Sequence, residues 1–318
     1  WNDNGDAIAT LQYTYYTRDK VDDTAARPLL ISFNGGPGSA SVWMHLAYTG
    51  PRVLKIDDEG YPIQPYGGKD NPYSVLDVAD IVYVNPVNTG YSRVVENAKG
   101  EMLSKEQQKE HFFGVNADIK YLAEWLNTFV NRNERWRSPK FLIGESYGTT
   151  RVSGLAHELQ NRQWMYINGV ILVSPTEIGI KREGPVEAAN RLPYFAATAW
   201  YHKALSADLQ AKDLDELLPE VEEFTVNKFL PAIAKGGFLA ADEKRAIIKQ
   251  AAKYAGLSEK FVEQNNLDIP TNFFWKELLR ERGQTVGRLD SRYLGIDKRD
   301  AGEFPDYWGE LTSWLHSF

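Results

Sequence analysis

One short stretch of this sequence combines a nucleophilic side chain with the local structure that would expose it. An apolar run, Phe141 to Ile143, leads into Gly144-Glu145-Ser146-Tyr147-Gly148, and an amphipathic segment follows from Thr149 to Gln160. This order predicts a strand, a sharp turn and a helix. Small flanking residues suit a strained turn, because no side chain then blocks its central residue. The stretch therefore predicts a nucleophilic Ser146 at a helix N-terminus, where partial positive charge favours a nearby anion.

A second, glycine-rich stretch could supply the hydrogen-bond donors that such a nucleophile needs. Leu29 to Phe33 is typical of a buried strand, and Asn34-Gly35-Gly36-Pro37-Gly38-Ser39 follows it directly. Glycines let backbone N–H groups approach a reacting oxygen with no Cβ in the way. An oxyanion hole is built from such a loop together with the N–H of the residue after the nucleophile. The alternative interpretation of this stretch is an ordinary tight turn.

Four motif blocks, in this order and spacing, resemble the serine carboxypeptidase family of α/β-hydrolases. They extend over about half of the chain, residues 28–175, and they are Asn34 to Ser39, Asn71-Pro72-Tyr73-Ser74, Asn85 to Ser92 and Gly144 to Gly148. The resemblance implies an α/β-hydrolase fold. It also implies a hydrolase that takes a peptide substrate and releases C-terminal residues through an acyl-enzyme on Ser146, without a cofactor.

The resemblance assigns roles to the residues around the serine. It implies an oxyanion hole made by the backbone N–H groups of Gly36 and Tyr147, and a site for the C-terminal carboxylate of a peptide at Asn34, Gly35 and Glu145. A carboxylate side chain can bind another carboxylate only if the pair shares a proton, because like charges at close range disfavour double ionisation. Substrate binding of this kind should therefore favour acidic pH.

The sequence departs from the family pattern at several positions. Many members have a glutamate where Tyr48 stands, and a tyrosine hydroxyl cannot share an acidic proton. Eukaryotic secreted members usually have disulfides and a cysteine where Ser39 stands, whereas this chain has no cysteine and no Asn-x-Ser/Thr glycosylation site. These absences favour a bacterial-type member. A periplasmic or secreted location is favoured over the cytoplasm, since the sequence starts at Trp1 and a removed signal peptide would explain this.

The histidine and carboxylate that a serine nucleophile requires are not evident. In α/β-hydrolases an Asp and then a His follow the serine, each on a later loop. The family's late Asp and His motifs are absent, and the sequence has only His45, His111, His157, His202 and His316. We interpret each as a packing or surface residue, and expect a missing C-terminal segment or another chain to supply the Asp and His of the triad. This chain alone should then hydrolyse little. The alternative is a triad completed by His316 and a carboxylate such as Asp306.

The pattern of elements predicts a mostly parallel sheet, covered on both faces, in an α/β-hydrolase fold. Buried strands are expected at residues 29–33, 79–84, 141–143 and 167–173. One amphipathic helix is expected at residues 112–129. After Pro175 the pattern becomes helical, with no strong strand. We therefore predict that residues 1–178 form the N-terminal part of the hydrolase core with its nucleophile elbow. Residues 179–318 are predicted to form an inserted helical cap, with a separate helical domain as the alternative.

The predicted sheet ends near Val173, so the C-terminal strands of the hydrolase sheet are expected to be missing.

Composition excludes other classes of protein. The net charge is −7 with no basic block, which argues against nucleic acid, and no apolar run is long enough to span a membrane. His157-Glu158 lacks the second histidine of a zinc motif, so no metal is expected. Two rivals remain open: an esterase, acyltransferase or lyase on the same fold, and a non-catalytic binding protein on a hydrolase scaffold.

Overall fold

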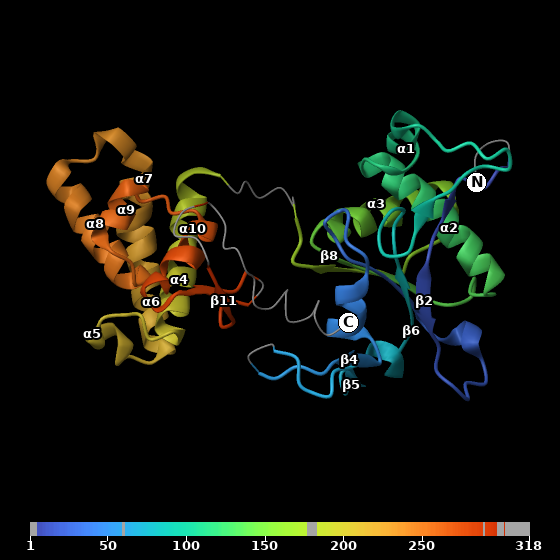
Figure 1. The fold of residues 1–318 in the computed structure, drawn as a ribbon, viewed down its shortest axis with the longest axis horizontal. Coiled ribbons are helices and arrows are strands. Elements are labelled where there is room, and N and C mark those ends of the chain that lie inside the picture. The colour runs from blue at the N-terminus through green and yellow to red at the C-terminus, as the bar shows by residue number, and fades with distance from the viewer. Residues whose placement is uncertain (1–4, 59–60, 177–182, 289, 298–301, 303–318) are drawn as a thin grey trace. The chain divides into compact units, whose positions relative to one another are not determined.

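The chain forms two compact units, each with a hydrophobic core of its own (Figure 1). The computed structural model describes residues 5–58, 61–176, 183–288, 290–297 and 302. The sheet unit comprises residues 1–54 and 68–179, and the helical unit comprises residues 55–67 and 180–318. Residues 55–67 thus group with the helical unit, although the sequence pattern places them in the N-terminal core. The role of residues 179–318 as a cap stays a prediction.

A five-stranded sheet forms the centre of the sheet unit. Its order is β2 (Tyr13–Tyr16), β6 (Asp80–Val84), β3 (Leu29–Phe33), β8 (Lys140–Glu145) and β9 (Gly169–Val173). β2 runs antiparallel to β6, and all the other neighbouring strands are parallel. Every residue of β3 and β6 is buried, as expected for the central strands of a parallel sheet. The predicted α/β class with a mostly parallel sheet is confirmed.

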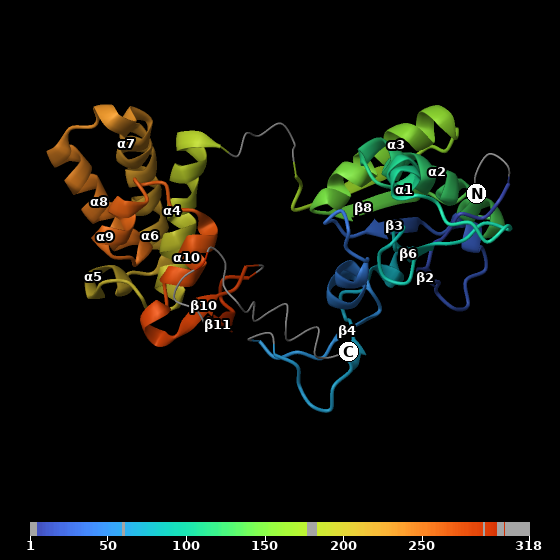
Figure 2. The same cartoon turned by 45° about the horizontal axis from the view of Figure 1, so that its top comes forward.

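Three helices lie on one side of this sheet (Figure 2). They are α1 (Lys105–Phe112), α2 (Val115–Arg132) and α3 (Tyr147–Arg162). Alternate residues of β3 and β6 pack against the inner faces of α2 and α3, for example Ile31 and Val82 against Leu126 and Leu155. The second face of the sheet is also predicted to be covered by helices, but its cover in the described residues is smaller. In the described part, its core is a small cluster around Ile81 and Met44, the latter from the π-helical turn η2 (Met44–Thr49).

The remaining elements of the sheet unit are short. They are β1 (Ala9–Thr10), η1 (Thr24–Ala26), β4 (Arg52–Leu54), β5 (Gly68–Asp70), η3 (Val75–Asp77) and β7 (Arg93–Val94). β1 pairs with β7 and β4 with β5, both antiparallel.

The strand β9 forms one edge of the central sheet. Among the described strands it pairs with β8 alone. Its apolar side chains are partly open to solvent, with 39% of Val170, 45% of Ile171 and 41% of Leu172 exposed. The sequence predicts a buried strand here. The strand is present, but it is not buried: residues on both of its faces are exposed, and no described strand pairs with its outer edge. An exposed apolar edge of this kind marks a surface that other protein normally covers.

The helical unit packs its helices around one large core. They are α4 (Gly184–Tyr201), α5 (Ala207–Gln210), α6 (Leu214–Phe224), η4 (Thr225–Phe229), α7 (Leu230–Lys235), η5 (Gly236–Phe238), α8 (Ala241–Ala255), α9 (Glu259–Gln264), α10 (Thr271–Glu277) and η6 (Arg280–Arg282). A small antiparallel hairpin follows, β10 (Gln284–Val286) and β11 (Leu294–Ile296). This hairpin corrects the expectation that the chain does not return to strand after Pro175.

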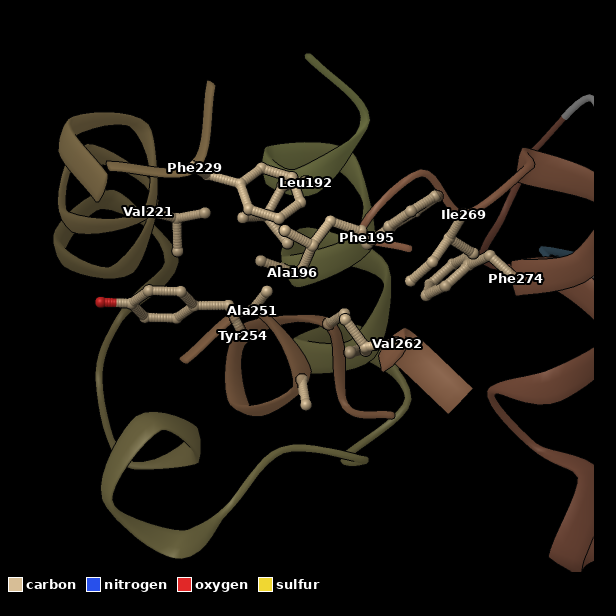
Figure 3. Packing of buried hydrophobic residues seen from close by; sticks show 14 of the residues in the cluster. Leu192, Phe195, Ala196, Val221, Phe229, Ala251, Tyr254, Val262, Ile269 and Phe274 are labelled. Atoms are coloured by element: carbon tan, nitrogen blue, oxygen red, sulfur yellow. The ribbon is translucent and has the colours of Figure 1, made fainter. Parts of the chain in front are cut away.

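The core of the helical unit contains a pair of stacked phenylalanines (Figure 3). The rings of Phe195 on α4 and Phe274 on α10 lie 4.0 Å apart between centroids, with 16° between their planes. Phe274 has no exposed surface. The stack joins two helices that are far apart in the sequence, so it fixes α10 against α4.

We predict that Phe274→Ala lowers the free energy of unfolding of the helical unit by about 3–5 kcal/mol, because it removes buried apolar surface and leaves a cavity. Urea titration of the protein would measure this. Phe238→Ala is the matched control, since Phe238 is 98% exposed and its removal should change stability by less than about 0.5 kcal/mol. Equal effects of the two substitutions would contradict this account of the core.

Candidate active site

The turn between β8 and α3 has the geometry expected of a nucleophile elbow. Ser146 lies at this turn with φ 55° and ψ −125°, a conformation that a non-glycine residue rarely adopts. A Cβ atom on Gly144 would lie 2.1 Å from the carbonyl oxygen of Gly148. Gly144 is therefore required by the closeness of the strand to the first turn of the helix. A Cβ atom on Gly148 would lie 3.0 Å from the carbonyl oxygen of Phe33, so glycine there lets the helix approach the end of β3.

Hydrogen bonds hold the backbone of Ser146 on both sides. Its N–H donates to the carbonyl of Val173 on β9 at 3.0 Å. Its carbonyl accepts from the N–H of Thr149 at 2.9 Å and from the hydroxyl of Thr149 at 2.7 Å. The strained backbone is thus fixed by a neighbouring strand and by the helix that it begins.

The glycine-rich loop after β3 lies directly against this elbow. β3 and β8 are parallel neighbours with Phe33 opposite Gly144, so the turns that follow them meet at the same edge of the sheet. A Cβ atom on Gly35 would lie 2.6 Å from both the carbonyl oxygen of Glu145 and the nitrogen of Tyr147. Gly36, the next residue, is exposed and has φ +107°. Glycine is needed at both positions, for space at the first and for backbone conformation at the second.

The structure brings together the two side chains that the resemblance assigns to carboxylate binding. Asn34 Nδ2 donates to Glu145 Oε2 at 3.2 Å. Asn34 Oδ1 accepts from the N–H of Met44 at 3.0 Å, which fixes the amide with its NH₂ group toward Glu145. Asn34 is only 1% exposed, whereas Glu145 is half-buried. The pair therefore presents a positioned donor and a carboxyl group beside the elbow.

Two of the motif blocks contribute by bracing loops. Asn71 Nδ2 donates to the carbonyls of Tyr48 and Gly50, at 3.0 and 2.8 Å, and so ties the end of η2 in place. Tyr48, which stands where many family members have glutamate, is 55% exposed. Asn85 Oδ1 accepts from the N–H of Ser41 at 2.8 Å, just beyond the glycine-rich loop. These asparagines hold the backbone that leads to and from the site.

A buried arginine that the sequence analysis overlooked also contacts the site. Arg151 on α3 is 1% exposed, and its Nε donates to Asp118 Oδ2 on α2 at 2.7 Å. Burial raises the pKa of the Asp118 carboxyl, and the charge and hydrogen bond of Arg151 act in the opposite direction. A signal for this pair exists in the sequence. Asp118 precedes Leu122 and Leu126 at intervals of four residues, so a charge interrupts an apolar helix face.

Three of the four histidines in the described ranges are hydrogen-bonded to groups other than Ser146. His45 Nε2 is hydrogen-bonded to the hydroxyl of Tyr16 at 2.8 Å, its ring stacks on Tyr83, and burial lowers its pKa. His157 contacts Asn161 on the outer part of α3. The other two are His202, whose ring lies 2.6 Å from the carbonyl oxygen of Ser291, and His111, at the end of α1. Within the ranges that the structure describes, no histidine is hydrogen-bonded to Ser146. His316 and Asp306 lie outside those ranges.

The described residues include no group of three histidine or acidic side chains placed to hold a metal ion. They also include no helix with the length and apolar character needed to cross a membrane.

Comparison with known proteins assigns the chain to a family. The family model for serine carboxypeptidase matches residues 6–236, which is more than half of the chain. The chain therefore belongs to the serine carboxypeptidase family, and its fold is that of an α/β-hydrolase. The matched range contains all four motif blocks and both strands whose ends form the site.

Curated relatives from a plant and a yeast are among the matches. Serine carboxypeptidase-like 29 of Arabidopsis thaliana is 27% identical over 42% of this chain and 25% of its own length. Serine carboxypeptidase-like 7 of the same plant is 24% identical over 58% of this chain and 40% of its own length. The pheromone-processing carboxypeptidase KEX1 of Kluyveromyces lactis is 31% identical over 42% of this chain and 18% of its own length. The chain thus spans less than half of each relative, and none of them supports the expected bacterial source.

Among solved structures, a prohormone-processing carboxypeptidase from Saccharomyces cerevisiae, KEX1(Δ)p, aligns with all of this chain and 65% of its own chain. Its sequence identity is 13% and its TM-score is 0.45.

We predict that Gly35→Ala in the complete protein slows the reaction of Ser146 with a fluorophosphonate probe by about 100-fold or more. The added methyl group would push the loop away from the elbow, and loss of one oxyanion donor costs about 10²–10³ in rate. Gly38→Ala is the control in the same loop, because a Cβ atom there would meet nothing within 4 Å. If both variants react at the wild-type rate, the loop does not serve Ser146.

Proposed function

We propose that the protein is a serine carboxypeptidase that releases C-terminal residues from peptides. The observation that supports this most strongly is the placement of Asn34 and Glu145, hydrogen-bonded to each other directly beside the elbow. A hydrolase for neutral esters has no need of such a pair. A substrate with a free carboxylate would be held by the asparagine amide and, at acidic pH, by a proton shared with Glu145.

The proposed reaction is an acyl transfer in two steps. The hydroxyl oxygen of Ser146 attacks the carbonyl carbon of the last peptide bond, and the negative oxygen of the intermediate accepts hydrogen bonds from the N–H groups of Gly36 and Tyr147. The C–N bond then breaks, and the C-terminal amino acid leaves with the proton that came from the serine. Water hydrolyses the acyl-enzyme and restores the hydroxyl group.

We also propose that a further segment, or another chain, carries the Asp and His that this mechanism requires. The exposed outer edge of β9 supports this, because a parallel strand with open apolar side chains calls for another strand beside it. The described histidines support it as well, since none of them is hydrogen-bonded to Ser146 and three have other partners. On this proposal residues 1–318 alone should hydrolyse little. A comparison of their turnover with that of the complete protein tests this.

We predict that the complete protein cleaves a peptide with a free C-terminus about 10- to 150-fold faster, in kcat/KM, than the same peptide with a C-terminal amide. This ratio corresponds to about 1.5–3 kcal/mol for one lost charge-assisted hydrogen bond. Glu145→Gln should reduce the preference, most strongly at acidic pH, because the amide cannot share a proton.

The control for this experiment is a small activated ester without a carboxylate, whose hydrolysis Glu145→Gln should leave nearly unchanged. Equal rates on acid and amide would instead favour the esterase or acyltransferase alternative. A wild-type protein that binds peptides but neither cleaves them nor reacts with fluorophosphonate would favour the non-catalytic alternative. The expected periplasmic or secreted location stays a prediction, which fractionation of the source cells would test.

A further inference from the structure

The guanidinium group of Arg151 joins the elbow helix to the glycine-rich loop. Nη1 donates to the carbonyl of Asn34 at 2.8 Å, and Nη2 donates to the carbonyl of Pro37 at 3.2 Å. These two carbonyls lie on either side of Gly35 and Gly36. A third contact fixes the peptide unit between them, since the carbonyl of Gly35 accepts from the N–H of Ser39 at 3.1 Å. The loop is thus tied at three of its carbonyls, two of them by one side chain.

The surroundings of Arg151 restrict its position further. Its guanidinium lies 5.7 Å from the ring centre of Phe33 and 5.2 Å from that of Tyr147, the residues that precede the loop and follow the nucleophile. Cation–π contacts at such distances stabilise a desolvated guanidinium. The group therefore sits where β3 ends and α3 begins.

A carboxylate balances the buried charge. Asp118 accepts from Arg151 through Oδ2 and from the hydroxyl of Tyr121 through Oδ1, at 2.7 and 3.3 Å. The hydroxyl oxygen of Tyr121 in turn accepts from the N–H of Val87 at 3.1 Å. The network thus extends from the glycine-rich loop to α2 and to the loop after β6. Both charged groups have their polar atoms matched, which is the condition for a tolerable buried ion pair.

We propose that Arg151 is a positioning residue of the active site. The N–H donors of its planar guanidinium group fix the backbone from Asn34 to Pro37. They thereby fix the direction of the Gly36 N–H and the position of Asn34 beside the elbow. It does not contact the substrate. Lysine cannot replace it, because a single ammonium group cannot bond two separate carbonyls and a carboxylate in one plane. This inference rests on the proposed function only for its effect on rate, and not for its effect on the loop.

Arg135 provides a matched comparison. It is 2% exposed, and its Nη1 donates to Asp80 at 2.7 Å, so it is also a buried arginine in an ion pair. Asp80 begins β6, and Arg135 therefore lies at the amino ends of the parallel strands, the edge opposite to the site. A lysine at position 135 disturbs a buried ion pair without touching the loop.

The first test measures the loop without relying on activity. Amide hydrogen exchange in the complete protein would follow the N–H groups of Ser39 and Ser41, which donate to Gly35 and Asn85. Arg151→Lys should make them exchange at least about 10-fold faster, as expected for a local opening, whereas Arg135→Lys should leave them unchanged. Unchanged exchange in Arg151→Lys, or the same increase in both variants, would overturn the proposal.

The second test measures the rate. With an activated ester that has no free carboxylate, Arg151→Lys should lower kcat by about 100-fold, the effect of misplacing one oxyanion donor. KM should stay within about threefold, since ground-state binding of the ester needs no loop donor. Arg135→Lys should keep both constants. A wild-type protein without activity would refute the proposed function, while hydrogen exchange would still decide the role of Arg151.

A double variant guards against simple misfolding. Arg151→Met alone would leave Asp118 buried and unpaired, whereas Arg151→Met with Asp118→Leu removes both charges, a change that proteins often tolerate. The folded double variant should show the same rapid exchange at Ser39 and Ser41 and the same low kcat as Arg151→Lys. Wild-type exchange and kcat in that variant would overturn the proposal.

Discussion

The close approach of two backbone turns is the constraint on which the rest of this site depends. The turn after β3 and the turn after β8 lie so near each other that a methyl group on Gly35 would reach within 2.6 Å of two backbone atoms. Parallel pairing of β3 and β8 places both turns at the same edge of the sheet, and their register puts Phe33 opposite Gly144. The two turns can come this close only because Gly35 has no Cβ atom.

A buried ion pair, Arg151 with Asp118, holds the glycine-rich loop in this position. Backbone carbonyls that turn inward at the end of a strand need donors, since unsatisfied buried polar groups cost about 1–3 kcal/mol each. Arg151 supplies donors to two of them, and Asp118 on α2 neutralises its charge. The helices on that side of the sheet therefore do more than bury the apolar residues of β3. They carry the charged pair that fills the space behind the site.

Periodicity and motif chemistry were reliable where the relevant contacts are local. Patterns within short windows predict the elbow, the loop and the helical character of residues after 183. They also predict the strands β3, β6, β8 and β9 in their order along the chain. The helix expected at residues 112–129 appears as α2, which begins at Val115 after Gly114 with φ +134°. The sequence did not predict the separate helix α1, which ends at Phe112. Prediction failed where the outcome depends on distant partners. Solvent exposure of β9 is decided by what covers its faces and pairs with its edge, and the hairpin of β10 and β11 is too short for alternation to reveal it.

The sequence by itself determined the class of fold and the family, the elbow at Ser146 and the residues around it. Such features need particular residue types at fixed spacings, glycine above all, and spacing is visible in one dimension. The tertiary structure alone decided that Asn34 and Glu145, 111 residues apart, share a hydrogen bond. It alone brought the guanidinium group of Arg151 into contact with the loop and gave three of the described histidines other hydrogen-bond partners. These outcomes depend on strand register and helix packing, which join residues that no local pattern connects.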